Sequence, residues 1–174
     1  MAFQDFVLIH KKNDCISTIH ENADGGIIVC SENDSTYQYI YRTGEKFLLI
    51  KVDGGLIKRK NNDTKKCDYL LLNVTDDVNL SDIPHSVFIE LKGTDLVHAY
   101  QQILATIDEY EVDLSGSRFH ARIIVSRLHR PQYTTCYHKY RVEFKRRNCS
   151  FPDPQEREMT ERTGVDGNPT QQNQ

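Results

Sequence analysis

The sequence Val87-Phe88-Ile89-Glu90-Leu91-Lys92-Gly93 is a short apolar run that ends in an acid, an apolar spacer, a base and a glycine. Such a run is typical of a buried strand, on which successive side chains point to opposite faces. Glu90 and Lys92 therefore share one face of the strand. Because burying an acid and a base is costly unless they hold each other or bind something, we take this strand as the first candidate for a functional site.

Two further elements flank this strand. An earlier apolar run, Cys67-Asp68-Tyr69-Leu70-Leu71-Leu72, carries an acid near its beginning. After the strand, an amphipathic helix is predicted over 94–110. Thr94 is its predicted N-cap, because a threonine oxygen can accept a first-turn N–H. The apolar residues of the helix recur on one stripe: Leu96, Tyr100, Ile103 and Ile107.

The order of the other predicted elements indicates the fold class. Residues 16–19 could extend an N-terminal helix, and 133–147 is helical or extended. Alternation and apolar runs predict the remaining elements as strands: 27–30, 37–42, 47–52, 67–73, 86–92 and 119–126. A strand meander followed by a helix and a strand predicts an α/β (α+β) fold with a mixed central sheet and flanking helices.

Length and composition favour one domain. The chain has 174 residues, of which 38% are hydrophobic. We expect a single domain over 1–151 and a disordered polar tail over 152–174, which has few apolar residues. No apolar run approaches the roughly 18 residues of a membrane span, so no membrane partner is expected. The five cysteines form no CxxC pair, which favours free thiols in a reducing, cytoplasmic location.

Positive charge is concentrated in one part of the chain. Between Arg118 and Arg147 there are nine Lys or Arg residues and one acid, Glu143, although the net charge of the whole chain is −3. Five further basic residues precede Asp68: Lys58, Arg59, Lys60, Lys65 and Lys66. We expect them, with Arg127 and Arg130, to follow a nucleic-acid backbone. A solvated basic surface is the alternative.

Asp68, then Glu90-Leu91-Lys92 on the next strand, and a helix carrying Gln101 and Gln102 resemble the PD-(D/E)XK nuclease superfamily. This superfamily includes restriction endonucleases, Holliday-junction resolvases and RecB-like nuclease domains. The resemblance covers a motif core over 45–127 and implies a restriction-endonuclease-like core of helix, three strands, helix and strand. The chain departs from the pattern in several respects. The residue before Asp68 is Cys67 rather than proline, the region before Phe47 looks more β than helical, and the tyrosine spacing that RecB-like members show after the helix glutamine is absent.

The resemblance implies a metal-dependent nuclease that hydrolyses phosphodiester bonds. Asp68, Glu90 and Lys92 would be catalytic, and Mg²⁺ or Mn²⁺ would be bound by Asp68, Glu90 and the backbone carbonyl of Leu91. The superfamily's habits favour DNA over RNA, and its small members favour a homodimer. Gln102 or Gln101 would support the site.

A further acid from upstream is common in the superfamily, and the sequence leaves its identity open. Glu45 is the first candidate, Asp53 the second and Glu32 the third. Two alternatives to the nuclease remain. The same fold could be a catalytically inactive module that binds nucleic acid or protein. Glu90 and Lys92 could also be a structural ion pair.

Overall fold

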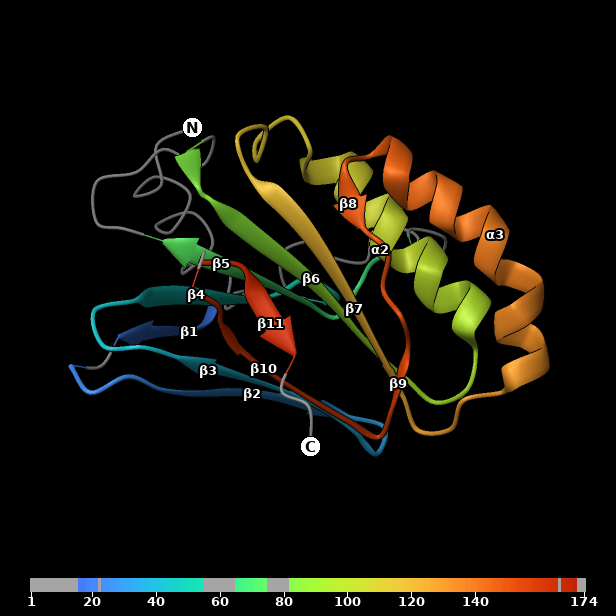
Figure 1. Ribbon diagram of the computed structural model, residues 1–174, viewed down its shortest axis with the longest axis horizontal. Coiled ribbons are helices and arrows are strands. Elements are labelled where there is room, and N and C mark those ends of the chain that lie inside the picture. The colour runs from blue at the N-terminus through green and yellow to red at the C-terminus, as the bar shows by residue number, and fades with distance from the viewer. Residues whose placement is uncertain (1–15, 22, 55–64, 75–81, 166, 172–174) are drawn as a thin grey trace.

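The computed structural model describes residues 16–21, 23–54, 65–74, 82–165 and 167–171. They form three layers: a four-stranded sheet, a seven-stranded sheet and a pair of helices (Figure 1). The helices are α2 (Leu96–Tyr110) and α3 (Arg130–Arg146). The strands are β1 (Ile16–Glu21), β2 (Gly26–Glu32), β3 (Ser35–Tyr41), β4 (Lys46–Lys51), β5 (Tyr69–Val74), β6 (His85–Lys92), β7 (Arg118–Val125), β8 (Cys149–Ser150), β9 (Gln155–Glu156), β10 (Glu158–Thr163) and β11 (Pro169–Gln171).

The large sheet has the strand order β1-β4-β5-β6-β7-β8, with β9 also paired to β7. Strands β4, β5 and β6 form an antiparallel meander. Strand β7 then lies parallel to β6, in register from His85↔Arg118 to Lys92↔Val125. Because a parallel pair needs a crossover connection, α2 passes over one face of the sheet between these two strands. The predicted α/β fold class with a mixed central sheet is confirmed.

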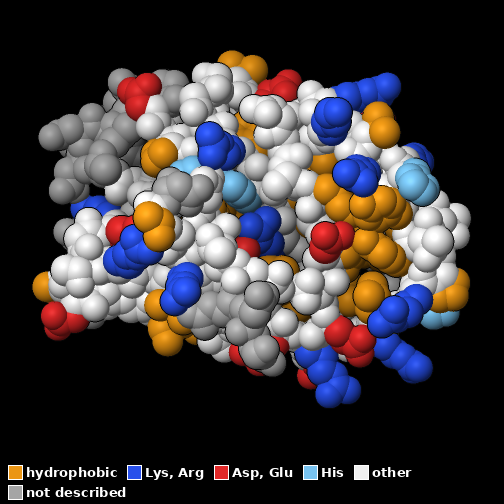
Figure 2. All heavy atoms as spheres, viewed as in Figure 1, with side chains coloured by type: hydrophobic (Ala, Val, Ile, Leu, Met, Phe, Trp, Pro, Cys, Tyr) orange, Lys and Arg blue, Asp and Glu red, His pale blue; other side chains and the backbone are white. Residues whose placement is uncertain are grey.

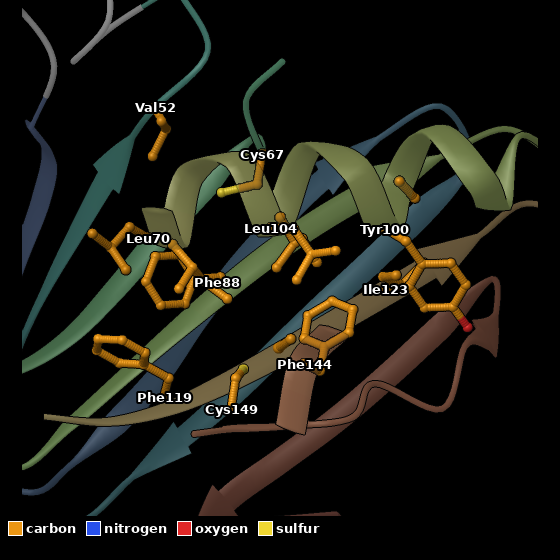
Figure 3. Close-up of a cluster of buried hydrophobic side chains, with 14 of the residues drawn as sticks. Val52, Cys67, Leu70, Phe88, Tyr100, Leu104, Phe119, Ile123, Phe144 and Cys149 are labelled. Atoms are coloured by element: carbon orange, nitrogen blue, oxygen red, sulfur yellow. The ribbon is translucent and has the colours of Figure 1, made fainter. Parts of the chain in front are cut away.

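The helices cover one face of the large sheet and enclose its main core. Figure 3 shows Leu70, Phe88 and Ile123 of the sheet beside Leu104 and Tyr100 of α2. The predicted apolar stripe of α2 is buried as expected. Its N-cap is Asp95, whose carboxylate accepts the His98 N–H at 3.1 Å, so the prediction of Thr94 as N-cap was wrong by one residue.

The small sheet covers the opposite face of the large one. Its strand order is β11-β10-β3-β2. Tyr37 and Tyr39 of β3 are buried in a second core, together with Val87, Ile89 and other residues of the large sheet. Because β6 alternates, Val87, Ile89 and Leu91 face the small sheet while Phe88 belongs to the core beneath the helices. Glu90 therefore faces the helices.

The prediction of a disordered tail over 152–174 was wrong for the residues of this segment that the structure describes, 152–165 and 167–171. Strand β10 lies parallel to β3, and β11 pairs antiparallel with β10. Met159, Glu161 and Thr163 alternate inward and are buried. Two of these inward residues are polar, and partners in the fold stabilise them: Tyr37 and Arg122 hydrogen-bond Glu161. A polar segment can form a buried strand when its inward side chains find such partners.

Two other segments can be compared with the sequence-based predictions. One prediction was wrong, and for the other segment the structure decides between the two alternatives. Residues 16–21 form strand β1, antiparallel to β4, so the prediction of a helix over 16–19 was wrong. Three of the four residues 16–19 are β-branched, which favours a strand. The segment left as helical or extended is helix α3, with Pro131 in its first turn, where a missing N–H costs nothing.

Candidate active site

The register of β5 and β6 brings the three predicted catalytic residues together. Tyr69 pairs with Ile89, so Asp68, one residue before β5, lies opposite Glu90 in this antiparallel pair. The Leu91 N–H donates to Asp68 Oδ2 at 2.7 Å and fixes the direction of that carboxylate. On the same strand, Lys92 Nζ lies 2.8 Å from Glu90 Oε1.

Glu90 is fully buried, and its carboxylate is poorly compensated. Lys92 forms an ion pair with it at 2.8 Å, and the Lys92 ammonium and the Asp68 backbone both lower the pKa of Glu90 without offsetting its burial. Among the described residues, neither Glu90 oxygen accepts a hydrogen bond. Burial, and then the negative charge of Asp68, raise the pKa of Glu90 to about 9. A carboxylate in this state needs a proton or a cation.

The second carboxylate is perturbed in the same direction. Burial raises the pKa of Asp68 to about 6, against the hydrogen bond from Leu91, which lowers it. The charges of Glu32 and Asp53 raise it further, while that of Lys92 lowers it. Two neighbouring acids with raised pKa values and one nearby lysine form an electrostatic environment that favours a positively charged ligand.

Helix α2 holds the loop that leads into Asp68. Gln102 Nε2 donates to the Lys66 carbonyl oxygen at 2.6 Å. The Cys67 N–H donates to Thr106 Oγ1 at 2.9 Å. Figure 3 shows Cys67 beside α2, and burial followed by the charge of Glu90 raises the pKa of the Cys67 thiol. This thiol is therefore inert, and the helix acts by positioning Asp68.

The two helix glutamines have different roles. Gln102 is buried, and within the described part of the chain its Oε1 atom has no hydrogen-bond partner. Gln101 instead accepts from Lys65 Nζ and donates to the Tyr140 hydroxyl at 3.2 Å. Gln102 is therefore the glutamine that supports the candidate site, and Gln101 joins the loop to α3.

The proximity of the three candidate upstream acids to Asp68 does not follow the order that the sequence predicted. Glu45 precedes β4 at the end that pairs with Val74, and Asp68 lies at the opposite end. Its carboxylate accepts from the Arg42 N–H and from Thr163 Oγ1, both at 2.7 Å, so the prediction that Glu45 supports the site was wrong. Asp53 and Glu32 both lie close enough to affect the pKa of Asp68, with Glu32 the stronger.

Glu32 was placed last among the candidates because it comes from the small sheet. It ends β2, and the hairpin to β3 turns at Asn33 and Asp34, both with positive φ. At the start of β3, Ser35 Oγ donates to the Lys92 carbonyl oxygen at 3.2 Å. A hairpin turn was visible in the sequence, but its place against β6 depends on how the two sheets pack.

Several predicted nucleic-acid contacts lie near this end of the sheet. Arg127 lines an open hollow of about 620 Å³ together with Thr94, Asp95 and His129. Arg130 is exposed at the start of α3, whereas Lys66 is buried. Lys65 is exposed beside Gln101. Lys58, Arg59 and Lys60 lie outside the described residues.

The donor set fits a hard divalent cation. Asp68 and Glu90 offer carboxylate oxygens, which Mg²⁺ and Mn²⁺ prefer, and the Glu90 oxygens lack hydrogen-bond donors in the described chain. Nowhere in the described ranges do three or more His, Cys, Asp or Glu side chains gather in a group that could hold a metal. A cation here would therefore take its other ligands from backbone carbonyls, water or substrate, as Mg²⁺ commonly does.

Comparisons with known proteins give no relative. No family model, no curated protein and no solved structure matches this chain. Within the residues that the structure covers, we find no helix with the length and apolar character needed to cross a membrane. Cys30, Cys67, Cys136 and Cys149 are free, buried thiols.

Proposed function

We propose that this protein is a metal-dependent nuclease that hydrolyses phosphodiester bonds, with DNA favoured over RNA as substrate and Mg²⁺ or Mn²⁺ as cofactor. The observation that carries the proposal is the fully buried carboxylate of Glu90, which lies opposite Asp68 and beside Lys92 and accepts no hydrogen bond of good geometry among the described residues. Ordinary structural acids are compensated by donors when they are buried. The surroundings of Glu90 support a role as a metal ligand.

The order of elements around the site supports the proposal. Strands β4, β5 and β6 run antiparallel, α2 follows, and β7 returns parallel to β6. This is the order of three strands, helix and strand that the resemblance to PD-(D/E)XK nucleases implies. The resemblance also places an acid beside the beginning of the second strand and Glu-x-Lys at the end of the third, where Asp68, Glu90 and Lys92 lie.

Each residue of the proposed site would have a different role in hydrolysis. Asp68 and Glu90 would hold the cation, and Leu91 orients Asp68 through its N–H. A bound divalent cation supplies Lewis-acid stabilisation of phosphate charge and activates water. Lys92, with 23% of its side chain exposed, can direct a water toward phosphorus or stabilise the negative charge that develops there. Gln102 keeps the Lys66–Cys67 backbone in place behind Asp68.

A cleavage assay tests this proposal. Supercoiled plasmid, linear duplex, single-stranded DNA and RNA would each be incubated with wild type in Mg²⁺, Mn²⁺ or EDTA. We expect metal-dependent cleavage that Asp68→Asn, Glu90→Gln and Lys92→Gln each reduce by on the order of 10²-fold or more. Glu109→Gln makes the same chemical change on the exposed surface of α2 and should cleave like wild type.

The alternatives predict different results. A catalytically inactive module on the same fold would bind the oligonucleotides in EDTA but cleave none of them with either metal. A structural ion pair would give no cleavage and no metal-induced change in melting temperature. Cleavage that survives Glu90→Gln would contradict the assignment of the site itself.

A further inference from the structure

A hollow of about 470 Å³ lies at the other end of the large sheet, between the start of β7, β8 and the last turns of α3. Arg118 and His120 line it from β7, and Arg141 and Lys145 line it from α3. Phe119 and Phe151 complete an apolar wall. Of the described residues that line this hollow, none is an acid. The face shown in Figure 2 carries Lys and Arg side chains above these elements.

The cations of this region fall into two groups. Arg146 and Arg147 form ion pairs with Glu143, and Arg147 also pairs with Asp108. By contrast, Arg118, Arg141 and Lys145 form no ion pair with any acid in the described part of the structure. The three cations that line the hollow therefore have no carboxylate partner, whereas Arg146 and Arg147, which have one, lie outside it.

Helix electrostatics alone does not explain this clustering. Lys145 and Arg146 both belong to the last turn of α3, where cations are favoured. That argument applies equally to both residues, yet only Lys145 lines the hollow. Arg118 comes from β7, where no helix end requires a cation. Like charges brought together without counter-charge repel, and a bound anion removes that repulsion.

Two of the cations are held in place by neutral partners. Arg141 Nη1 donates to the Tyr137 hydroxyl at 3.0 Å, and its guanidinium lies 5.6 Å from the centre of that ring. Arg118 Nη1 donates to Asn168 Oδ1 at 3.0 Å. A guanidinium has five N–H donors, so each arginine keeps several for a further acceptor. Oriented guanidinium groups suit the oxygens of phosphate.

The hollow is distinct from the candidate active site. In the parallel pair of β6 and β7, Arg118 is in register with His85, and Val125 with Lys92. Seven residues of strand separate the two positions, which corresponds to roughly 23 Å at about 3.3 Å per residue. A phosphate bound in the hollow therefore cannot be the phosphate that is cleaved at the proposed active site.

We propose that this basic hollow is a phosphate-binding site for the backbone of a nucleic-acid chain or for a free nucleotide. Arg118, Arg141 and Lys145 supply the charge, and Phe151 offers an apolar surface beside it. The inference needs no catalysis, because binding here does not involve Asp68, Glu90 or Lys92. A nucleic acid seated in the hollow would contact the protein far from the proposed point of cleavage.

Binding measured in EDTA tests this site without the nuclease activity. Fluorescence anisotropy with labelled single-stranded and duplex DNA, and calorimetry with ATP and inorganic pyrophosphate, would compare wild type with Arg141→Gln/Lys145→Gln. We expect the double variant to bind at least one of these ligands on the order of tenfold more weakly. For DNA, the slope of log affinity against log salt should become shallower by roughly 1.5, since each lost phosphate contact removes about 0.7 to 0.9.

A matched control removes the same charge elsewhere on α3. Lys139 and Arg146 lie on this helix but do not line the hollow, so Lys139→Gln/Arg146→Gln should bind like wild type or show a smaller loss. Arg141→Lys/Lys145→Arg should retain most of the affinity. If the Arg141→Gln/Lys145→Gln variant loses affinity for DNA, the ligand of the hollow is a nucleic-acid backbone. If it loses affinity for ATP or pyrophosphate alone, the ligand is a free nucleotide. If both glutamine variants behave alike with every ligand, the site assignment is wrong.

Discussion

Two buried glutamates on opposite faces of the large sheet have very different surroundings. Glu161 of β10 accepts the Tyr37 hydroxyl at 2.9 Å and Arg122 Nε at 2.8 Å, one donor to each oxygen. Glu90 of β6 has Lys92 nearby, and neither of its oxygens accepts a hydrogen bond from the described chain. The hydrogen bonds of the first carboxylate are satisfied within the fold, whereas the second needs a proton or a cation in addition to Lys92. Burial alone therefore does not distinguish a structural acid from a functional one, whereas the donors around it do.

Replacing each glutamate by glutamine should have opposite effects on the free energy of unfolding at the two sites. Glu161→Gln leaves Arg122 largely buried without its partner and should lower the free energy of unfolding by about 3 kcal/mol. Glu90→Gln removes a buried carboxyl group that must take up a proton on folding at pH 8, and should raise the free energy of unfolding at that pH by roughly 1 to 3 kcal/mol. Urea denaturation at pH 8 measures both. The comparison fails if Glu90→Gln is the more destabilising change.

The pH dependence of stability should also separate the two glutamates. The pKa of Glu90 is raised to about 9, so between about pH 5 and 9 the folded protein holds a proton that the unfolded chain has lost. The free energy of unfolding should therefore fall as pH rises, by up to roughly 1.4 kcal/mol per pH unit. Asp68, with a pKa of about 6, adds to the fall between about pH 4 and 6.

Denaturation curves from pH 5 to 9 measure this slope. Glu90→Gln should flatten it above pH 6, and Asp68→Asn should flatten it mainly below that value. Glu161→Gln serves as the control and should leave the slope unchanged above pH 6. A wild-type stability that rises between pH 6 and 9 would contradict the burial of an uncompensated Glu90.

Metal binding should stabilise the protein through Glu90 and not through Glu161. Saturating Mg²⁺ or Mn²⁺ adds roughly 1 to 3 kcal/mol at ten- to hundredfold excess over Kd. We expect thermal unfolding to shift upward with metal for wild type and for Glu161→Gln, and to be insensitive to metal for Glu90→Gln. Equal metal shifts in all three proteins would place the cation elsewhere.

The smallest effect is expected for the lysine. Lys92→Met removes the ion pair, but Glu90 can stay neutral by keeping its proton, and Lys92 is partly exposed. The free energy of unfolding at pH 6 should change by less than about 1 kcal/mol. The corresponding Arg122→Met change, which removes a donor from Glu161, should cost more in the same urea experiment.

The sequence predicted the helix-covered face of the molecule better than the other face. Alternation in β6 and the apolar stripe of α2 placed Glu90 and Lys92 correctly, because they follow local hydrophobic periods. The choice between Gln101 and Gln102 needed the rotation of α2 about its axis, which the structure supplies. Glu45 was misplaced although the predicted meander argues against it, because the beginning of β4 lies opposite the end of β5 in an antiparallel pair.

The small sheet could not be predicted, because its last strands are polar. In β10 the inward positions alternate, but Glu161 and Thr163 occupy two of them, so no hydrophobic pattern marks the strand. Their burial depends on Tyr37, Arg122 and Tyr39, which are distant in the sequence. Hydrogen bonds between residues that are distant in the sequence produce no recognisable pattern in the local sequence.

The parallel pairing of β3 with β10 has a consequence for protein synthesis. Strand β3 begins at Ser35, and its neighbour β10 begins at Glu158, so the ribosome releases the two strands far apart in time. Until β10 emerges, Tyr37 and Arg122 lack their carboxylate partner, and one edge of β3 is open to other strands. The small sheet is therefore completed only after strands β4 to β7 and both helices have been made, and until then the nascent chain carries an exposed edge.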